Sequence, residues 1–221
     1  MSVPESGGDF DLGGAVGVRL IDAGPAEMAA VERQLGPIRI PLEREPDLVV
    51  RFVERLEPSS VLRYVGLDEA AFDDQDFFVL RGKYKSRLRV RIPFERVGQR
   101  CEITCERGLS AVPLLVAILN ATMLAKGFLP LHAAAFVKKG KGVVATGWSK
   151  GGKTETLLAF MSRGARYVAD EWLYLAGDGQ RMFGIPEPIR VWNWHLASLP
   201  ELRGRLTRRR AAPLSGLRVV G

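Results

Sequence analysis

The sequence predicts an α/β fold, α+β overall, in which a β-rich N-terminal region precedes a core of mixed strands and helices. Two observations predict this class. Alternating or β-branched patterns typical of strands dominate residues 17–108. Residues 143–156 then read as an apolar strand, a glycine-rich loop and a helix. We therefore expect a flexible leader over residues 1–16, a β-rich region over 17–108 and a second domain over 109–221.

The composition is that of an ordinary globular protein. Of the 221 residues, 47% are hydrophobic and 26% are charged, so a sizeable core can form without disulfides or metals. The net charge is +7, but the basic residues are spread along the chain apart from a late cluster within residues 202–210. This pattern favours a solvated basic surface over nucleic-acid binding. The apolar runs are shorter than a membrane span, and no signal peptide is recognisable, so we expect no membrane association.

The leader has glycines and acidic residues but few apolar ones, so we expect it to be flexible. In the β-rich region, strands are predicted over residues 47–56, 77–80 and 86–93. In the last of these, Leu88, Val90 and Ile92 alternate with Arg87, Arg89 and Arg91. The arginine stripe is typical of a solvated sheet face, which we favour over contact with an acidic partner.

Two cysteines, Cys101 and Cys105, stand four residues apart in an alternating segment and should share one side of a strand. Neither has Cys or His neighbours at zinc-ligand spacing. We interpret them as reduced packing residues of a cytoplasmic protein.

The second domain is predicted to begin with a buried helix over residues 111–126, followed by a strand over 129–137 that contains His132. A basic turn at 138–142 leads to a second strand, which makes a hairpin. His132 should therefore lie at the end of the hairpin where the glycine-rich loop begins. A lone histidine is more often structural than functional.

The elements after the loop follow in short succession. We expect a helix over 154–162, a strand over 166–169, a hairpin with strands 172–175 and 182–185, and an extended segment over 186–195. The tryptophans of that segment favour packing over base stacking. The arginine cluster reads as a solvated helix end, and residues 217–221 as a strand without a visible partner, which suggests that the domain continues.

The glycine-rich loop satisfies the phosphate-loop pattern G-x-x-x-x-G-K-[ST] through Gly147, Gly152, Lys153 and Thr154. In such a loop, backbone amides surround a phosphate, the lysine reaches the β and γ oxygens, and the hydroxyl binds Mg²⁺. The positive end of the following helix adds to the anion site. The candidate nucleotide-binding residues are Gly147, Trp148, Ser149, Lys150, Gly151, Gly152, Lys153, Thr154 and Glu155.

An acidic pair, Asp170 and Glu171, follows the strand at 166–169. In parallel α/β sheets, ligands bind at the carboxyl ends of strands, so we expect this pair to share an edge with the loop. Carboxylates next to a phosphate loop match the metal and base arrangement of phosphoryl transfer, although a solvated turn would explain them too.

The order of Leu131-His132, the loop and helix start at 147–156, and the segment Arg163-Gly164-Ala165-Arg166-Tyr167-Val168-Ala169-Asp170-Glu171 resembles the catalytic domain of HPr kinase/phosphorylase and its relatives. The resemblance covers about residues 129–195. It implies a fold related to phosphoenolpyruvate carboxykinase and ATP-dependent phosphorylation of a serine hydroxyl, and it suggests a homo-oligomer.

The resemblance also implies roles for single residues. Lys153 would hold the phosphates, Thr154 would bind Mg²⁺, Asp170 would take the hydroxyl proton, and His132 would lie near the transferred phosphate. Glu171 replaces the family's second aspartate at the metal. Glu187 and Arg190 would stand in for a later glutamate-arginine element as metal ligand and catalytic residue. This element departs from the family's pattern, which places the reverse phosphorylase reaction in doubt.

Two other function classes are compatible with the same residues. The chain could be a nucleotide-binding switch or scaffold that phosphorylates no acceptor, or a degenerate domain whose loop only supports the fold. A kinase releases ADP only when an acceptor is present, whereas a switch changes its assembly on binding nucleotide. The acceptor itself, a protein, a peptide or a small molecule with a hydroxyl group, is not encoded in a recognisable motif.

Overall fold

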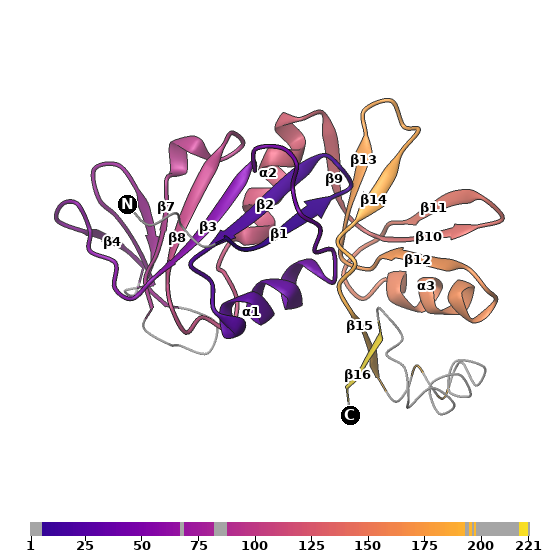
Figure 1. The fold of residues 1–221 in the computed structure, drawn as a ribbon. Helices are drawn as coiled ribbons and strands as arrows, with labels where there is room; N and C mark the ends of the chain where they lie inside the picture. The colour runs from indigo at the N-terminus through magenta and orange to yellow at the C-terminus, as the bar shows by residue number, and fades with distance from the viewer. Residues whose placement is uncertain are drawn as a thin grey trace. The chain divides into compact units, whose positions relative to one another are not determined.

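The computed structural model describes residues 6–66, 69–81, 88–192, 195, 197 and 217–220, and the chain divides into two compact units (Figure 1). The first unit spans Met1–Phe128 and the second Leu129–Gly221. Most of the described elements are strands, with few helices, so the protein is α+β as predicted. Among the described residues, no helix has the length and apolarity needed to cross a membrane.

An eight-stranded sheet forms the frame of the first unit, in the order β1-β2-β3-β8-β7-β6-β5-β4. The pairs β2–β3 and β3–β8 are parallel, and the other pairs are antiparallel. The strands are β1 (Ser6–Leu12), β2 (Val16–Ile21), β3 (Leu48–Val53), β4 (Arg63–Val65), β5 (Ala70–Phe72), β6 (Phe77–Val79), β7 (Val90–Ile92) and β8 (Cys101–Glu106).

Strand β1 corrects the expectation of a flexible leader over residues 1–16. Phe10 and Leu12 alternate with Asp9 and Asp11, and both apolar side chains are buried. Asp9 pairs with Arg19 on the neighbouring strand at 2.8 Å. The period-two pattern, rather than the overall composition, decided the local structure because two large buried side chains are enough to anchor an edge strand.

Two α-helices cover the sheet of this unit, α1 (Pro25–Leu35) and α2 (Leu115–Ala125), and a short 3₁₀ helix spans Phe94–Arg96. Helix α2 corresponds to the predicted helix at 111–126, but it belongs to the first unit rather than to the second domain. Its Leu115 and Leu119 are fully buried, and Lys126 at its end forms an ion pair with Asp47 at 2.5 Å. The boundary therefore lies at residue 128, not 108.

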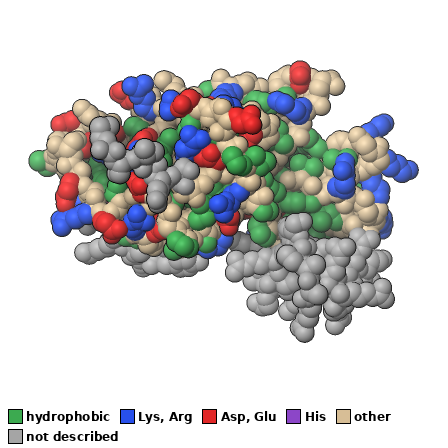
Figure 2. All heavy atoms as spheres, viewed as in Figure 1, with side chains coloured by type: hydrophobic (Ala, Val, Ile, Leu, Met, Phe, Trp, Pro, Cys, Tyr) green, Lys and Arg blue, Asp and Glu red, His purple; other side chains and the backbone are tan. Residues whose placement is uncertain are grey.

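The cysteines lie as predicted on one side of β8, where both are buried and free. Of the arginine stripe, Arg89 and Arg91 are half-buried and lie within 3.7 Å of the carboxylates of Glu57 and Asp76, respectively. Arg87 lies outside the described residues. On the visible face of the first unit, basic and acidic side chains are interspersed (Figure 2).

The second unit contains small sheets and one described α-helix, α3 (Lys153–Ser162). One sheet has the antiparallel order β11-β10-β12, and another has the order β14-β13-β9. The strands are β9 (Phe128–His132), β10 (Ala134–Lys138), β11 (Lys141–Ala145), β12 (Arg166–Ala169), β13 (Trp172–Ala176), β14 (Met182–Gly184), β15 (Ile189–Trp192) and β16 (Leu217–Val220). The predicted hairpins β10–β11 and β13–β14 are both present.

The predicted single strand at 129–137 is wrong, because the chain passes from one sheet to another at Ala133. Strand β9 joins the β13–β14 sheet, whereas β10 lies between β11 and β12. The amide of Ala133 donates a hydrogen bond to the carbonyl oxygen of Glu171 at 3.1 Å, which fixes the crossing point. A continuous apolar run does not reveal such a break, since both halves remain extended.

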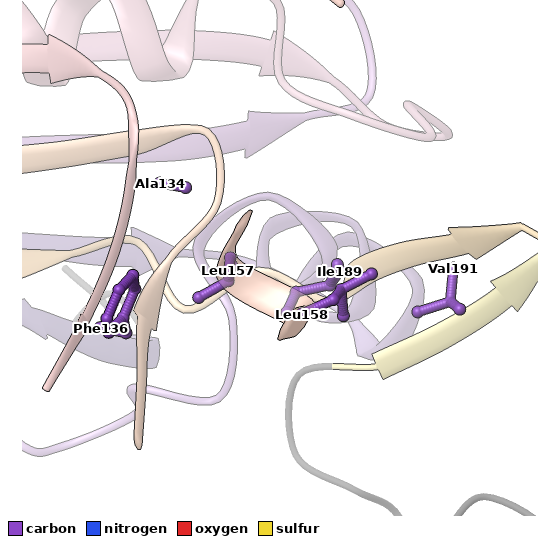
Figure 3. Packing of buried hydrophobic residues seen from close by; sticks show 6 residues of the cluster. All are labelled: Ala134, Phe136, Leu157, Leu158, Ile189 and Val191. Atoms are coloured by element: carbon purple, nitrogen blue, oxygen red, sulfur yellow. The ribbon is translucent and has the colours of Figure 1, made fainter. Parts of the chain in front are cut away.

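Strand β10 supports two hydrophobic clusters because its side chains alternate between the faces of the sheet. On one face, Ala134 and Phe136 belong to a cluster with Leu157 and Leu158 of α3 (Figure 3). Ile189 and Val191 of β15 complete it. On the other face, Ala133 and Ala135 pack with Ala169 and Leu173.

Strand β16 corrects the expectation that the final strand lacks a partner. It pairs in parallel with β15, with Ile189 opposite Leu217 and Trp192 opposite Val220. The arginine cluster at 202–210 lies outside the described residues.

Candidate functional site

The glycine-rich loop connects β11 to α3 and has a backbone that requires glycine at two positions. Gly152, which immediately precedes the helix, has φ +86°, a left-handed conformation that side chains disfavour. A Cβ atom on Gly151 would lie 2.9 Å from the carbonyl oxygen of Trp148, which already accepts the Gly151 amide at 3.0 Å. Gly147, in contrast, has open space where a Cβ would be. The backbone conformation of the loop is therefore constrained mainly at Gly151 and Gly152.

The sheet topology brings the predicted site segments to one edge. Because β10 runs antiparallel between β11 and β12, the carboxyl ends of the outer strands lie at the edge where β10 begins. The loop follows β11, Asp170 follows β12, and His132 lies just before β10. The convergence was expected, but from adjacent parallel strands; the antiparallel strand between them achieves the same result.

These segments surround a cavity of about 280 Å³. Most of the predicted site residues line it, and Gly147, Trp148 and Glu187 are not among the lining residues. Trp148 is 92% exposed. The lining residues are His132, Ser149, Lys150, Gly151, Gly152, Lys153, Thr154, Glu155, Asp170 and Glu171.

Asp170 is the buried carboxylate of the cavity, with 8% of its surface exposed. The Thr154 hydroxyl donates to its Oδ1 and Oδ2 at 3.0 and 3.2 Å. Burial raises the pKa of the Asp170 carboxyl group to about 6, and the charges of Glu171 and Glu155 act in the same direction. The Thr154 hydrogen bond and the Lys153 charge oppose the rise without cancelling it. The carboxylate is thus ionised at neutral pH with a proton affinity suited to general base catalysis.

Lys153, the first residue of α3, donates from Nζ to the carbonyl oxygens of Gly147 and Trp148 at 3.0 and 3.2 Å. These acceptors belong to the loop itself, so the ammonium group folds back over it. The first amides of α3 have no acceptors within the helix, as at every helix start, and the loop presents them at the cavity. A bound anion could therefore recruit both the amides and the ammonium group.

His132 and Glu171 form a pair at the rim of the cavity. Their Nε2 and Oε2 atoms are 2.8 Å apart, and each side chain is about half exposed. The imidazole also lies near the indole of Trp172, with ring centroids 5.5 Å apart. His132 is consequently oriented by two neighbours beside the acidic pair.

Sequence reasoning missed a second histidine at this site. His195 is buried, and its Nε2 lies 3.4 Å from Oε1 of Glu155, which lines the cavity. The chain contains two histidines. Each of them has its Nε2 atom within 3.4 Å of a carboxylate oxygen of a glutamate that lines the cavity. Forty residues separate His195 from Glu155, and no spacing in the sequence links them.

The later glutamate-arginine element gains no support from the described geometry. The backbone carbonyl of Glu187 accepts a hydrogen bond from the Tyr167 hydroxyl at 2.7 Å. The side chain of Arg190 lies outside the described residues, so its predicted catalytic role stays a prediction.

The donor set suits a hard cation better than a transition metal. Within the described part of the chain, no group of three His, Cys, Asp or Glu side chains is placed to hold a metal ion by itself. Thr154, Asp170 and Glu171 instead offer hydroxyl and carboxylate oxygens. Mg²⁺ is usually held by one or two such groups together with substrate phosphates and water.

Comparison of the chain with models of known protein families, with curated proteins and with solved structures gave no match.

Proposed function

We propose that the protein is a cytoplasmic, ATP- and Mg²⁺-dependent kinase of the HPr kinase type that phosphorylates a hydroxyl group of a protein, a peptide or a small molecule. The observation that carries the proposal is the hydrogen bond from Thr154 to the buried carboxylate of Asp170. It joins the start of α3 to the end of β12 within one cavity. A hydroxyl acceptor placed there would meet a base and a phosphate-binding loop together.

Phosphate binding would use the first amides of α3 and the ammonium group of Lys153. The ammonium group leaves the carbonyl oxygens of Gly147 and Trp148 and turns to the phosphates. Since negative charge grows on the γ-phosphoryl oxygens during transfer, these donors stabilise the transition state. Loss of Lys153 therefore affects both binding and transfer.

Asp170 would act as the general base. Its carboxylate accepts the proton of the acceptor hydroxyl while the acceptor oxygen forms a bond to the γ-phosphorus. The bond from that phosphorus to the bridging oxygen breaks, and ADP leaves with its electron pair. With a pKa of about 6, Asp170 is ionised at pH 7.5 and ready to take the proton. His132, held by Glu171, would lie beside the transferred group.

Mg²⁺ would neutralise the phosphate charge when it is bound beside Thr154 and Glu171. The Thr154 hydroxyl can donate to Asp170 and still offer a lone pair to a cation, since a hydroxyl has one donor and two acceptor sites. The cavity holds the carboxylates of Glu155, Asp170 and Glu171 against the cations of Lys150 and Lys153. This excess of negative charge makes phosphate binding without a divalent cation unfavourable.

The test incubates the full chain with γ-labelled ATP, Mg²⁺ and a cell lysate, and the labelled product is then identified. We expect label transfer from the wild type and none from Asp170→Asn, while ATP binding persists in the variant. Asp178→Asn, on an exposed turn, is the matched control and should transfer normally. Transfer by Asp170→Asn would reject the base assignment. Binding of ATP with a change in assembly, but without labelled product, would favour the switch.

A further inference from the structure

The first unit contains a second and larger cavity, of about 630 Å³, at the β4 end of its sheet. Three arginines, Arg55, Arg81 and Arg89, line it together with Tyr64 and leucine side chains. Arginine and tyrosine are enriched at protein-binding surfaces because both combine apolar area with hydrogen-bond donors. This mixture indicates a ligand with acidic and apolar groups.

The three arginines of this cavity differ in their partners. Arg55 and Arg89 share one carboxylate, that of Glu57, at 2.5 and 3.7 Å. Arg81 has no ion pair among the described residues. A carboxylate from a ligand would supply an ion-pair partner for the Arg81 guanidinium group.

Two glutamates also line the cavity, but each already has partners. The carboxylate oxygens of Glu106 accept the amides of Leu56 and Arg89 at 3.0 and 2.9 Å. Glu54 forms an ion pair with Arg107 at 2.8 Å. Together with Glu57, these carboxylates equal the three arginines in number, and they would repel a densely charged polyanion such as nucleic acid.

A sheet edge that pairs with no further strand in the described part of the chain adjoins the cavity. Strand β4 is the last strand of the sheet, and Tyr64, which lines the cavity, is its central residue. All three residues of β4 are exposed, and Val61, just before it, is 87% exposed. At the opposite edge, residues 38–42 cover β1 through hydrogen bonds to Asp9 and Asp11. An uncovered edge with apolar side chains can pair with an added strand.

We propose that the β4 edge and the arginine-lined cavity together bind an extended peptide segment with acidic side chains. The peptide backbone pairs with β4, one of its carboxylates enters the cavity to meet Arg81, and its apolar side chains contact Tyr64 and Val61. A peptide fits better than a nucleic acid because a strand edge offers main-chain hydrogen bonds and Glu54 and Glu106 disfavour phosphates. This site requires neither ATP nor the proposed kinase activity.

The experiment uses the full chain without nucleotide and measures fluorescence anisotropy of labelled eight-residue peptides. One peptide alternates glutamate with valine, and its control alternates lysine with valine. We expect saturable binding of the glutamate peptide only, weakened at least about tenfold by Arg81→Glu. Arg96→Glu, an exposed arginine on the 3₁₀ helix, is the matched control and should change the Kd less than about twofold.

Hydrogen exchange locates the peptide independently of the mutations. The amides of residues 61–65 should exchange more slowly when the glutamate peptide is bound, since a new strand protects the edge. If Arg81→Glu unfolds the chain, the highly exposed Arg55 provides a second variant, Arg55→Glu, with the same expected weakening.

Several results would overturn the proposal. These are no binding of the glutamate peptide, equal weakening by Arg81→Glu and Arg96→Glu, or unchanged exchange at residues 61–65. Equal or tighter binding of a single-stranded oligonucleotide would show a general polyanion site instead. A dimer in sedimentation that disappears with Tyr64→Ala would show that a second copy of the chain occupies the edge.

Discussion

Replacing Asp170 by asparagine should separate the proposed catalytic role of this carboxylate from its cost to folding. Burial raises the pKa of the folded Asp170 carboxyl group from 3.8 to about 6. The unfolded chain releases this proton near pH 3.9. Between these values the folded state binds more protons than the unfolded state, so stability falls as the pH rises. A difference of about 2 pH units at about 1.4 kcal/mol per unit amounts to about 3 kcal/mol.

Asparagine has no charge to bury and keeps an oxygen that can accept the Thr154 hydroxyl. We therefore expect Asp170→Asn to be more stable than the wild type by up to about 3 kcal/mol at pH 8. The difference should shrink toward zero as the pH approaches 4. Urea unfolding at several pH values, followed by circular dichroism, measures it.

The same variant should bind ATP and transfer no phosphate. Asp178→Asn removes a surface carboxylate and should change stability by less than about 0.5 kcal/mol. A stability difference at pH 8 that is absent or reversed, or one that does not change with pH, would refute the burial cost assigned to Asp170.

Four further predictions follow from the geometry. Lys153→Ala should abolish ATP binding in calorimetry while changing the Tm little, because the described hydrogen bonds of its Nζ go to exposed loop carbonyls. Retained affinity for ATP would contradict the proposed role of Lys153 in phosphate binding. Gly151→Ala should lower both the Tm and the affinity for ATP, because its Cβ would lie 2.9 Å from the Trp148 carbonyl oxygen. Gly147→Ala should leave the Tm unchanged, because its Cβ would meet open space. Equal effects of the two substitutions would show that close packing at Gly151 does not determine the loop conformation. Leu157→Ala should destabilise the second unit by about 2–5 kcal/mol in urea unfolding, since its side chain is fully buried; a loss below about 1 kcal/mol would exclude it from the core. Burial raises the pKa of the Cys101 thiol to about 11 and that of Cys105 to about 12, so neither should react with Ellman's reagent at pH 8 until urea unfolds the chain.

Local patterns predicted the elements around the candidate site well. The strand predicted at 166–169 is observed at β12 with the same bounds, and the helix after the loop differs from α3 by one residue. These elements are short, and a Gly or a charged residue marks their ends, so nearby residues specify them. The prediction of a flexible leader was wrong because its structure depends on a long-range contact. Phe10 and Leu12 acquire their partners only when β1 pairs with β2.

Long-range contacts decided which sheet each strand joins. Residues 129–137 look like one strand, yet Ala133 separates two strands of different sheets. Likewise, the periodicity of α2 predicts a buried helix but does not indicate which unit the helix packs against. The three-dimensional contacts place it in the first unit.

The sequence by itself determined the composition of the candidate site: the glycine-rich loop, the lysine and threonine that begin α3, and the acidic pair after β12. Only the tertiary structure decided that Asp170 lies buried against Thr154, that His132 meets Glu171 and that His195 reaches Glu155. The reason is physical. Residue type and spacing set what a segment can donate or accept, whereas the pKa of a carboxyl group and the partner of a histidine depend on which distant segments exclude water around them.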